Sequence, residues 1–137
     1  MISRFAATVL AALCLAAPGA SAQTTPDVDC ANAMTQMEMT FCAEQDWIAA
    51  DAALNAAWAP AMARMRALDA HQPADLKGAA DALRAAQRAW VSYRDLACIA
   101  EGYQMRGGSA EPMVIYGCRA RLTEARTEEL QALAAPM

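Results

Sequence analysis

The chain has 137 residues, of which 57% are hydrophobic and 19% are charged, and its formal net charge is −4 at pH 7. This length is typical of one domain. The negative charge argues against binding to nucleic acid or to an anionic membrane surface, and it suits a basic partner, although it is also ordinary for an exported soluble domain.

The first 22 residues have the form of a secretory signal peptide. Arg4 precedes an apolar run from Phe5 to Ala17, and Ala20-Ser21-Ala22 forms an A-x-A cleavage site. The apolar run is too short for a membrane span, which needs about 20 residues. We therefore expect residues 1–22 to be removed, which makes the chain one unit more negative.

The expected product is a periplasmic or secreted protein of residues 23–137. Cys14 could suggest a lipid anchor, but Leu13 stands where lipoprotein signals need a small residue. A lipid anchor is therefore the weaker interpretation, and no membrane anchor is expected.

The first helix is predicted to begin at a capping box. Thr35 would cap the helix, and Glu38 would reach back to the Thr35 amide. Apolar residues then recur at helical intervals: Phe41, Trp47, Leu54, Trp58, Met65 and Leu68. Pro60 interrupts this pattern, so we expect a kink or a break into two helices near residues 57–60.

Two breaks divide the rest of the chain. The linker His71–Asp75 precedes a second helix that runs to about Gln104, with Asp75 or Asp81 as its cap. The segment Gln104–Pro112 is a turn, and Pro112 fits the first turn of a third helix. The third helix should bury one stripe and end by Ala134, and the stripe comprises Ile115, Cys118, Leu122, Ala125 and Leu133.

Four cysteines remain after Cys14 is set aside, and an even number in a small exported domain indicates two disulfides. Three pairings are possible. We favour Cys30–Cys42 and Cys98–Cys118, because each then closes a loop of modest length. A metal site is disfavoured, since the close C-x-x-C spacing is missing and His71 is the only histidine.

No stretch has the alternating pattern of a strand, so the predicted fold class is all-α: a small, disulfide-tied bundle of three to four helices. Antiparallel packing of the second and third helices would bring Cys98 near Cys118.

The stretch Leu83–Cys98 is expected to organise this bundle. Leu83, Trp90 and Ala97 lie on one helical stripe, and the large apolar surface of Trp90 should sit where the helices meet.

Polar residues flank that stripe and have two interpretations. Gln87, Arg94 and Asp95 could form a polar site beside the tryptophan, or they could satisfy structural partners within the bundle. Asp51 and Asn55 on the first helix could reach Arg94 or Tyr93, either as a network that fixes helix register or as a ligand pocket. The structural interpretation is favoured in both cases.

The turn Arg106-Gly107-Gly108-Ser109 is the candidate partner-binding loop. Its glycines let backbone amides approach a partner closely, and a cation and a hydroxyl flank them. The alternative is a helix connection that needs left-handed torsions. Both interpretations stay open.

Catalysis is disfavoured, because Ser92 and Ser109 have no local base and His71 lies in a linker. No cofactor is predicted. Methionine thioethers can bind copper(I), which makes an exported copper carrier conceivable but the least favoured hypothesis. The methionines concerned are Met34, Met37, Met39, Met62, Met65, Met105 and Met113.

These segments together resemble the LprI-type lysozyme-inhibitor family, over a core of about residues 29–130. The matching elements are Cys30 and Cys42 around the capping box, Asp51 with Leu54-Asn55, Gln87-Arg88-Ala89-Trp90, Tyr93-Arg94-Asp95, Cys98, Gly107-Gly108-Ser109, Cys118, Thr123 and Arg126. Pro60 has no place in the family pattern.

The resemblance implies a single all-helical, non-catalytic domain in the periplasm or outside the cell. The first functional hypothesis is a lysozyme inhibitor that docks as a protein partner. The second is a cell-envelope interaction or structural module with no lysozyme role.

Overall fold

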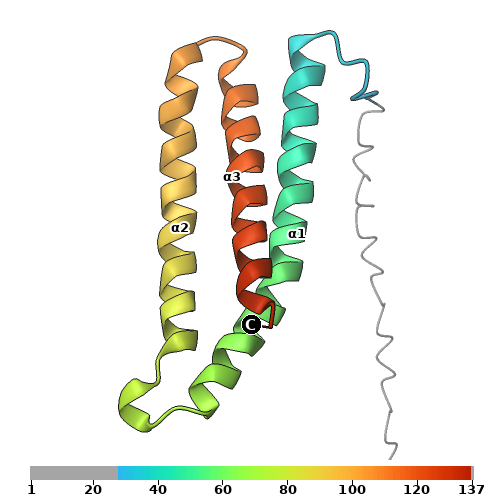
Figure 1. The fold of residues 1–137 in the computed structure, drawn as a ribbon. Helices are drawn as coiled ribbons and strands as arrows, with labels where there is room; N and C mark the ends of the chain where they lie inside the picture. Colours follow the sequence, from blue (N-terminus) through green and yellow to red (C-terminus); the bar gives the residue numbers. More distant parts are fainter. Residues whose placement is uncertain (1–27, 137) are drawn as a thin grey trace, which may run out of the picture.

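A computed structural model describes residues 28–136, which form a bundle of three helices with no strand among them (Figure 1). The α-helices are α1 (Gln36–Ala70), α2 (Ala79–Gly102) and α3 (Glu111–Ala134), and the short 3₁₀ helices are η1 (Ala74–Leu76) and η2 (Tyr103–Met105). The all-α prediction is confirmed. The expected signal peptide, residues 1–22, lies outside the described residues.

The predicted capping box begins α1. The Thr35 side chain accepts a hydrogen bond from the Glu38 amide at 3.2 Å, and the Glu38 carboxylate accepts one from the Thr35 amide at 2.9 Å. Two amides that the first turn leaves without intrahelical partners are thereby satisfied.

Pro60 lies inside α1, and the helix continues through it to Ala70. Figure 1 shows α1 bending, with its C-terminal part leaning toward the connection to α2. The predicted kink is therefore present and the alternative of two separate helices is wrong. A proline removes one backbone hydrogen bond, which a long helix packed on both sides of the bend tolerates.

The cap of α2 comes from α1, and the prediction of Asp75 or Asp81 as the cap is wrong. The Asp69 carboxylate, in the last turn of α1, accepts hydrogen bonds from the amides of Gly78, Ala79 and Ala80 at 2.8, 2.9 and 3.0 Å. A carboxylate at a helix N-terminus is also favoured by the helix dipole. Asp81 instead pairs with Arg84 on the same helix.

The core combines small alanines with larger leucine, methionine and tryptophan side chains. α3 lies between α1 and α2 in Figure 1. The buried apolar cluster comprises Leu54, Ala57, Ala61, Met62, Ala80, Leu83 and Leu130, with Trp58, Met65, Trp90 and Ala134 packed against it.

The buried stripe of α3 differs from the prediction. Ala125 and Leu133 are exposed, whereas Ala120, Thr123, Thr127 and Leu130 are buried. The prediction followed the larger aliphatic residues. The structure instead buries the face of α3 that carries Ala120, Thr123, Thr127 and Leu130, and this rotation turns Ala125 and Leu133 toward solvent.

Both expected disulfides are present in the structure. Cys30–Cys42 ties the lead-in to α1, and Cys98–Cys118 ties α2 to α3, with Cα–Cα distances of 5.6 and 5.4 Å. Cys98 and Cys118 are almost completely buried. Within residues 28–136, no helix has both the length and the apolar run that crossing a membrane requires.

We predict that Asp69→Asn destabilises the protein at neutral pH but not in acid. The three amides, of which that of Ala80 contributes most, hold the pKa of Asp69 below its usual value of 3.8. A lowered folded-state pKa stabilises the fold above the unfolded-state pKa, and this stabilisation is lost as pH falls through the folded-state value.

Thermal unfolding of wild type and Asp69→Asn should therefore give midpoints that differ at pH 7 and converge in acid, as the pH falls below 3.8 and through the lowered pKa of Asp69. Asp75→Asn, in η1, is the matched control and should leave the midpoint unchanged at both pH values. A constant difference between wild type and Asp69→Asn at all pH values would contradict the capping role.

We predict that the double variant Cys98→Ala/Cys118→Ala loses about 3 kcal/mol of unfolding free energy, because it opens a loop closed over a sequence separation of 20 residues and removes two buried sulfurs. The variant Cys30→Ala/Cys42→Ala opens a shorter loop, with a separation of 12 residues, and should lose less. Urea unfolding of both variants tests this order, and the reverse order would contradict it.

Candidate functional site

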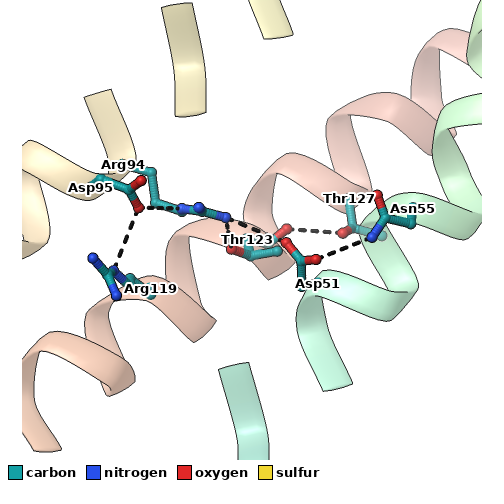
Figure 2. Close-up of polar contacts among 7 residues, drawn as sticks. All are labelled: Asp51, Asn55, Arg94, Asp95, Arg119, Thr123 and Thr127. Atoms are coloured by element: carbon teal, nitrogen blue, oxygen red, sulfur yellow. Dashed lines mark hydrogen bonds and ion pairs between the residues drawn. The ribbon is translucent and has the colours of Figure 1, made fainter. Parts of the chain in front are cut away.

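Arg94 of α2 is the centre of a polar cluster that joins the three helices (Figure 2). Its side chain is only 8% exposed. Its Nε donates a hydrogen bond to Oδ1 of Asp95 at 3.0 Å, and its Nη1 lies 3.5 Å both from Oδ1 of Asp51 on α1 and from Oγ1 of Thr123 on α3. One guanidinium therefore contacts polar groups on all three helices.

Aromatic rings enclose the same guanidinium. The Arg94 Cζ atom lies 5.6 Å from the ring centroid of Trp47 and 5.2 Å from that of Trp90. The Cζ atom of Arg119, on α3, lies 4.9 Å from the ring centroid of Trp47, and the Nε atom of Arg119 is 3.5 Å from Oδ1 of Asp95. Two arginines and two carboxylates thus balance their charges beside the tryptophans, which stabilises a buried cation.

The other residues of the predicted polar motif fall into three groups. Asn55 donates to Oδ2 of Asp51 at 3.1 Å, so it joins the cluster through that carboxylate. Gln87 accepts a hydrogen bond from Nε of Arg126 at 3.0 Å, which ties α2 to α3 separately. Tyr93 is 61% exposed and lies outside the cluster.

Several partners of Arg94 could not be predicted from the sequence. Trp47 was assigned only to the apolar stripe, and Arg119 was not singled out. Ring stacking places Tyr116 5.7 Å from Trp47, centroid to centroid. Burial raises the pKa of Tyr116, and its hydrogen bond to Glu44 raises it further, so its hydroxyl stays protonated beside the cluster.

A hollow of about 400 Å³ opens beside the cluster, between α1 and α2. Its lining is Asp51, Leu54, Asn55, Trp58, Gln87, Val91 and Arg94. Its polar groups bind one another or Arg126, and acidic and basic side chains face it together. These contacts favour the structural interpretation, in which the network fixes how the helices pack.

The predicted partner-binding loop, residues 106–109, is held in shape by Glu111. The Arg106 guanidinium pairs with Glu111 at 2.7 Å, and it lies 4.7 Å from the ring centroid of Tyr103. The Gly107 amide donates to the same carboxylate at 2.8 Å, with a φ of 76° that favours glycine. The Gly107 amide and, to a smaller extent, Arg106 hold the pKa of Glu111 below its usual range.

Both loop glycines donate their amides internally, because the Gly108 amide binds the Met105 carbonyl at 2.9 Å. The prediction that these amides reach a partner therefore needs revision. The loop offers a partner the exposed part of Arg106, the Ser109 residue and a fixed backbone shape.

An open hollow of about 520 Å³ lies between this loop and the first turns of α1. It is lined by Gln36, Met37, Thr40, Phe41, Glu44 and Ser109. Several large apolar side chains are exposed around it: Met34 by 85%, Met37 by 79%, Tyr103 by 59% and Met105 by 48%. We call this surface, comprising the lining residues, Met34 and residues 103–109, the bundle end.

The residues weighed for other chemistry are scattered. His71 caps the C-terminus of α1, in the connection to α2, and Figure 1 shows this connection at the other end of the bundle from the connection between α2 and α3. Met62 is buried in the core, and the Met113 sulfur accepts a hydrogen bond from Gln36. Among residues 28–136, no group of three or more His, Cys, Asp or Glu side chains is placed to hold a metal ion.

Comparison with known proteins supports one family. The sequence model of the family described as lysozyme inhibitor LprI matches residues 29–130. A protein of Rhizobium meliloti (strain 1021), described as uncharacterized protein R02472, is 46% identical over 124 residues, which are 88% of this chain and 88% of that protein. No solved structure matches the chain significantly.

We predict that Arg94→Ala lowers the free energy of unfolding by about 2–4 kcal/mol, because two carboxylates lose a buried partner and two rings lose their cation. Arg94→Lys keeps the charge but not the planar fork, so it should lose less. Arg84→Ala, which removes an exposed ion pair, is the control and should change stability by less than about 1 kcal/mol. Urea unfolding followed by tryptophan fluorescence measures all three, and equal losses for Arg94→Ala and Arg84→Ala would contradict the role of the cluster.

Proposed function

Because the chain belongs to the LprI lysozyme-inhibitor family, we propose that it is a non-catalytic, exported binding protein that blocks lysozyme by docking onto it. The two disulfides support a place outside the cytoplasm, where such bonds persist. The bundle end is the proposed docking surface, and its shape and composition are the observations that carry the proposal.

The composition of the bundle end is that of a protein-binding surface. Met37 and Phe41 form an apolar floor, and Gln36, Thr40 and Ser109 supply polar groups around it. Interfaces combine an apolar centre with a polar rim in this way. Exposed methionines adapt their shape to a partner, and Met34 and Met105 extend the apolar area.

The loop at this end is organised before binding. Glu111 holds both Arg106 and Gly107, and the Tyr103 ring covers one face of the guanidinium. Ordering a flexible loop on binding costs conformational entropy. A loop that is already ordered avoids this cost, so more of the contact energy contributes to the binding free energy.

Charge supports the choice of lysozyme as partner. The net charge of −4 complements an enzyme that is typically basic, which speeds association and makes it sensitive to salt. Lysozyme works with a pair of carboxyl groups in its cleft. The exposed Arg106 guanidinium and the Ser109 hydroxyl are donors that can face such groups when the loop enters the cleft.

We predict that the purified, oxidised protein inhibits lysis of a peptidoglycan suspension by chicken-type lysozyme, with a stoichiometric endpoint and weaker inhibition at high salt. The variants Arg106→Ala/Ser109→Ala and Met37→Ala should each raise the concentration for half-inhibition about tenfold or more, as expected for residues at an interface centre. Arg84→Ala and Leu133→Ala remove an exposed cation and an exposed apolar side chain elsewhere and should inhibit like wild type.

Full inhibition by both bundle-end variants would show that the docking surface lies elsewhere. Undiminished lysis in excess wild-type protein would contradict inhibition of this lysozyme class, and it would favour the alternative of a cell-envelope interaction module with no lysozyme role.

A further inference from the structure

The outward face of α2 carries an apolar stripe that no part of the described chain covers. Its large members, Leu96 and Ile99, are exposed by 67% and 40%. The stripe continues toward the start of the helix through small exposed residues, namely Ala82, Ala85, Ala89 and Ser92. Figure 1 shows α2 at the edge of the bundle.

The spacing along this stripe is that of a coiled-coil seam. Its six positions, from Ala82 to Ile99, are separated alternately by three and four residues. The opposite face of α2 already packs into the bundle through Leu83, Arg94 and Cys98. The helix therefore has two faces suited to packing, and within residues 28–136 only one of them has a partner.

We propose that this stripe pairs with the same stripe of a second copy of the chain, with the two α2 helices antiparallel about a two-fold axis. The sizes of the side chains along the stripe favour this arrangement. The stripe is small in its first half and large in its second half, so an antiparallel pair places the large half of each copy on the small half of the other.

One register places large residues opposite small ones along the whole of α2. When Ala79 of one copy lies opposite Gly102 of the other, the two helices overlap from end to end. In that register Leu96 faces Ala85 of the second copy, and Ile99 faces Ala82 of the second copy. A parallel pair would instead place Leu96 on Leu96 and Ala85 on Ala85, which forces the helices apart at one end only.

Charge favours the same orientation. The Arg88 guanidinium, on the flank of the stripe, makes no ion pair within residues 28–136. Asp95 lies on the same flank, seven residues later, and its side chain is 38% exposed. The antiparallel register brings Arg88 toward Asp95 of the second copy. An exposed ion pair adds little affinity, so the role of this contact is to favour the antiparallel over the parallel orientation of the two helices.

The dimer leaves the docking surface proposed above free. A seam of 24 helical residues is about 36 Å long. Antiparallel pairing puts the two bundle ends at opposite ends of this seam, so the second copy does not cover them. Dimerisation through α2 is therefore independent of lysozyme binding, and an experiment can contradict one of the two proposals without the other. An interface formed by two helices is small, so we expect a dissociation constant of the dimer in the micromolar range.

Sedimentation velocity over micromolar to millimolar concentrations of oxidised protein tests the association. Wild type should shift from monomer toward dimer as concentration rises, and Leu96→Glu should weaken dimerisation at least about tenfold. Leu133→Glu is the matched control, the same change at an exposed leucine of α3, and it should dimerise like wild type. A wild-type protein that stays monomeric throughout, or a Leu96→Glu variant that dimerises like wild type, would overturn the proposal.

Cysteine cross-linking tests the orientation. Ala85→Cys and Leu96→Cys should each form little covalent dimer alone, because the antiparallel register separates identical positions by 11 residues, or about 16 Å along the axis. A mixture of the two variants should form the mixed dimer on a non-reducing gel. Cross-linking of each variant with itself, and not with the other, would overturn the antiparallel arrangement.

Discussion

The packing of this bundle depends on one buried cation. Arg94 is buried on α2, yet its guanidinium meets Asp51 of α1 and Thr123 of α3, between the rings of Trp47 and Trp90. Three of the seven residues of the buried apolar cluster are alanines, which pack closely but provide little shape to fix helix rotation and register. A fork-shaped cation with partners on each helix supplies that specificity, and the Trp47 and Trp90 rings lie beside it.

The cluster also connects to the bundle end. Trp47, which covers Arg94, stacks on Tyr116, and Tyr116 is hydrogen-bonded to Glu44 at the rim of the apolar hollow. The two disulfides hold the same half of the molecule, one at the start of α1 and the other between α2 and α3. Cross-links and a packed polar network make the bundle end rigid, which favours the proposal that it is a docking surface.

The three helices could be predicted from the sequence because the patterns that indicate them are local. The capping box of Thr35 and Glu38 and the proline of α3 need only neighbouring residues, and the cysteine pairs follow from two antiparallel helices and a short lead-in. Asp69 was missed as the cap of α2, since it acts across a connection of several residues. The buried face of α3 was missed because Thr123 and Thr127 look like surface residues until two helices close over them.

Only part of the polar cluster could be predicted, because the sequence shows spacing along a helix but not how the helices are rotated against one another. Spacing along α1 and α2 brought Asp51, Asn55 and Arg94 together in prediction, whereas Arg119 joins from a third helix whose rotation the sequence did not reveal. The loop at residues 106–109 was recognised, but its internal bonding to Glu111 could not be inferred from composition.

Hydrogen exchange of the protein with and without lysozyme is the most direct test of the proposed docking surface. We predict slower amide exchange on complex formation at the start of α1 and across residues 103–111, with unchanged exchange near Asp51 and Gln87 in the groove between α1 and α2. Protection confined to that groove, or no protection in an excess of lysozyme, would contradict docking through the bundle end.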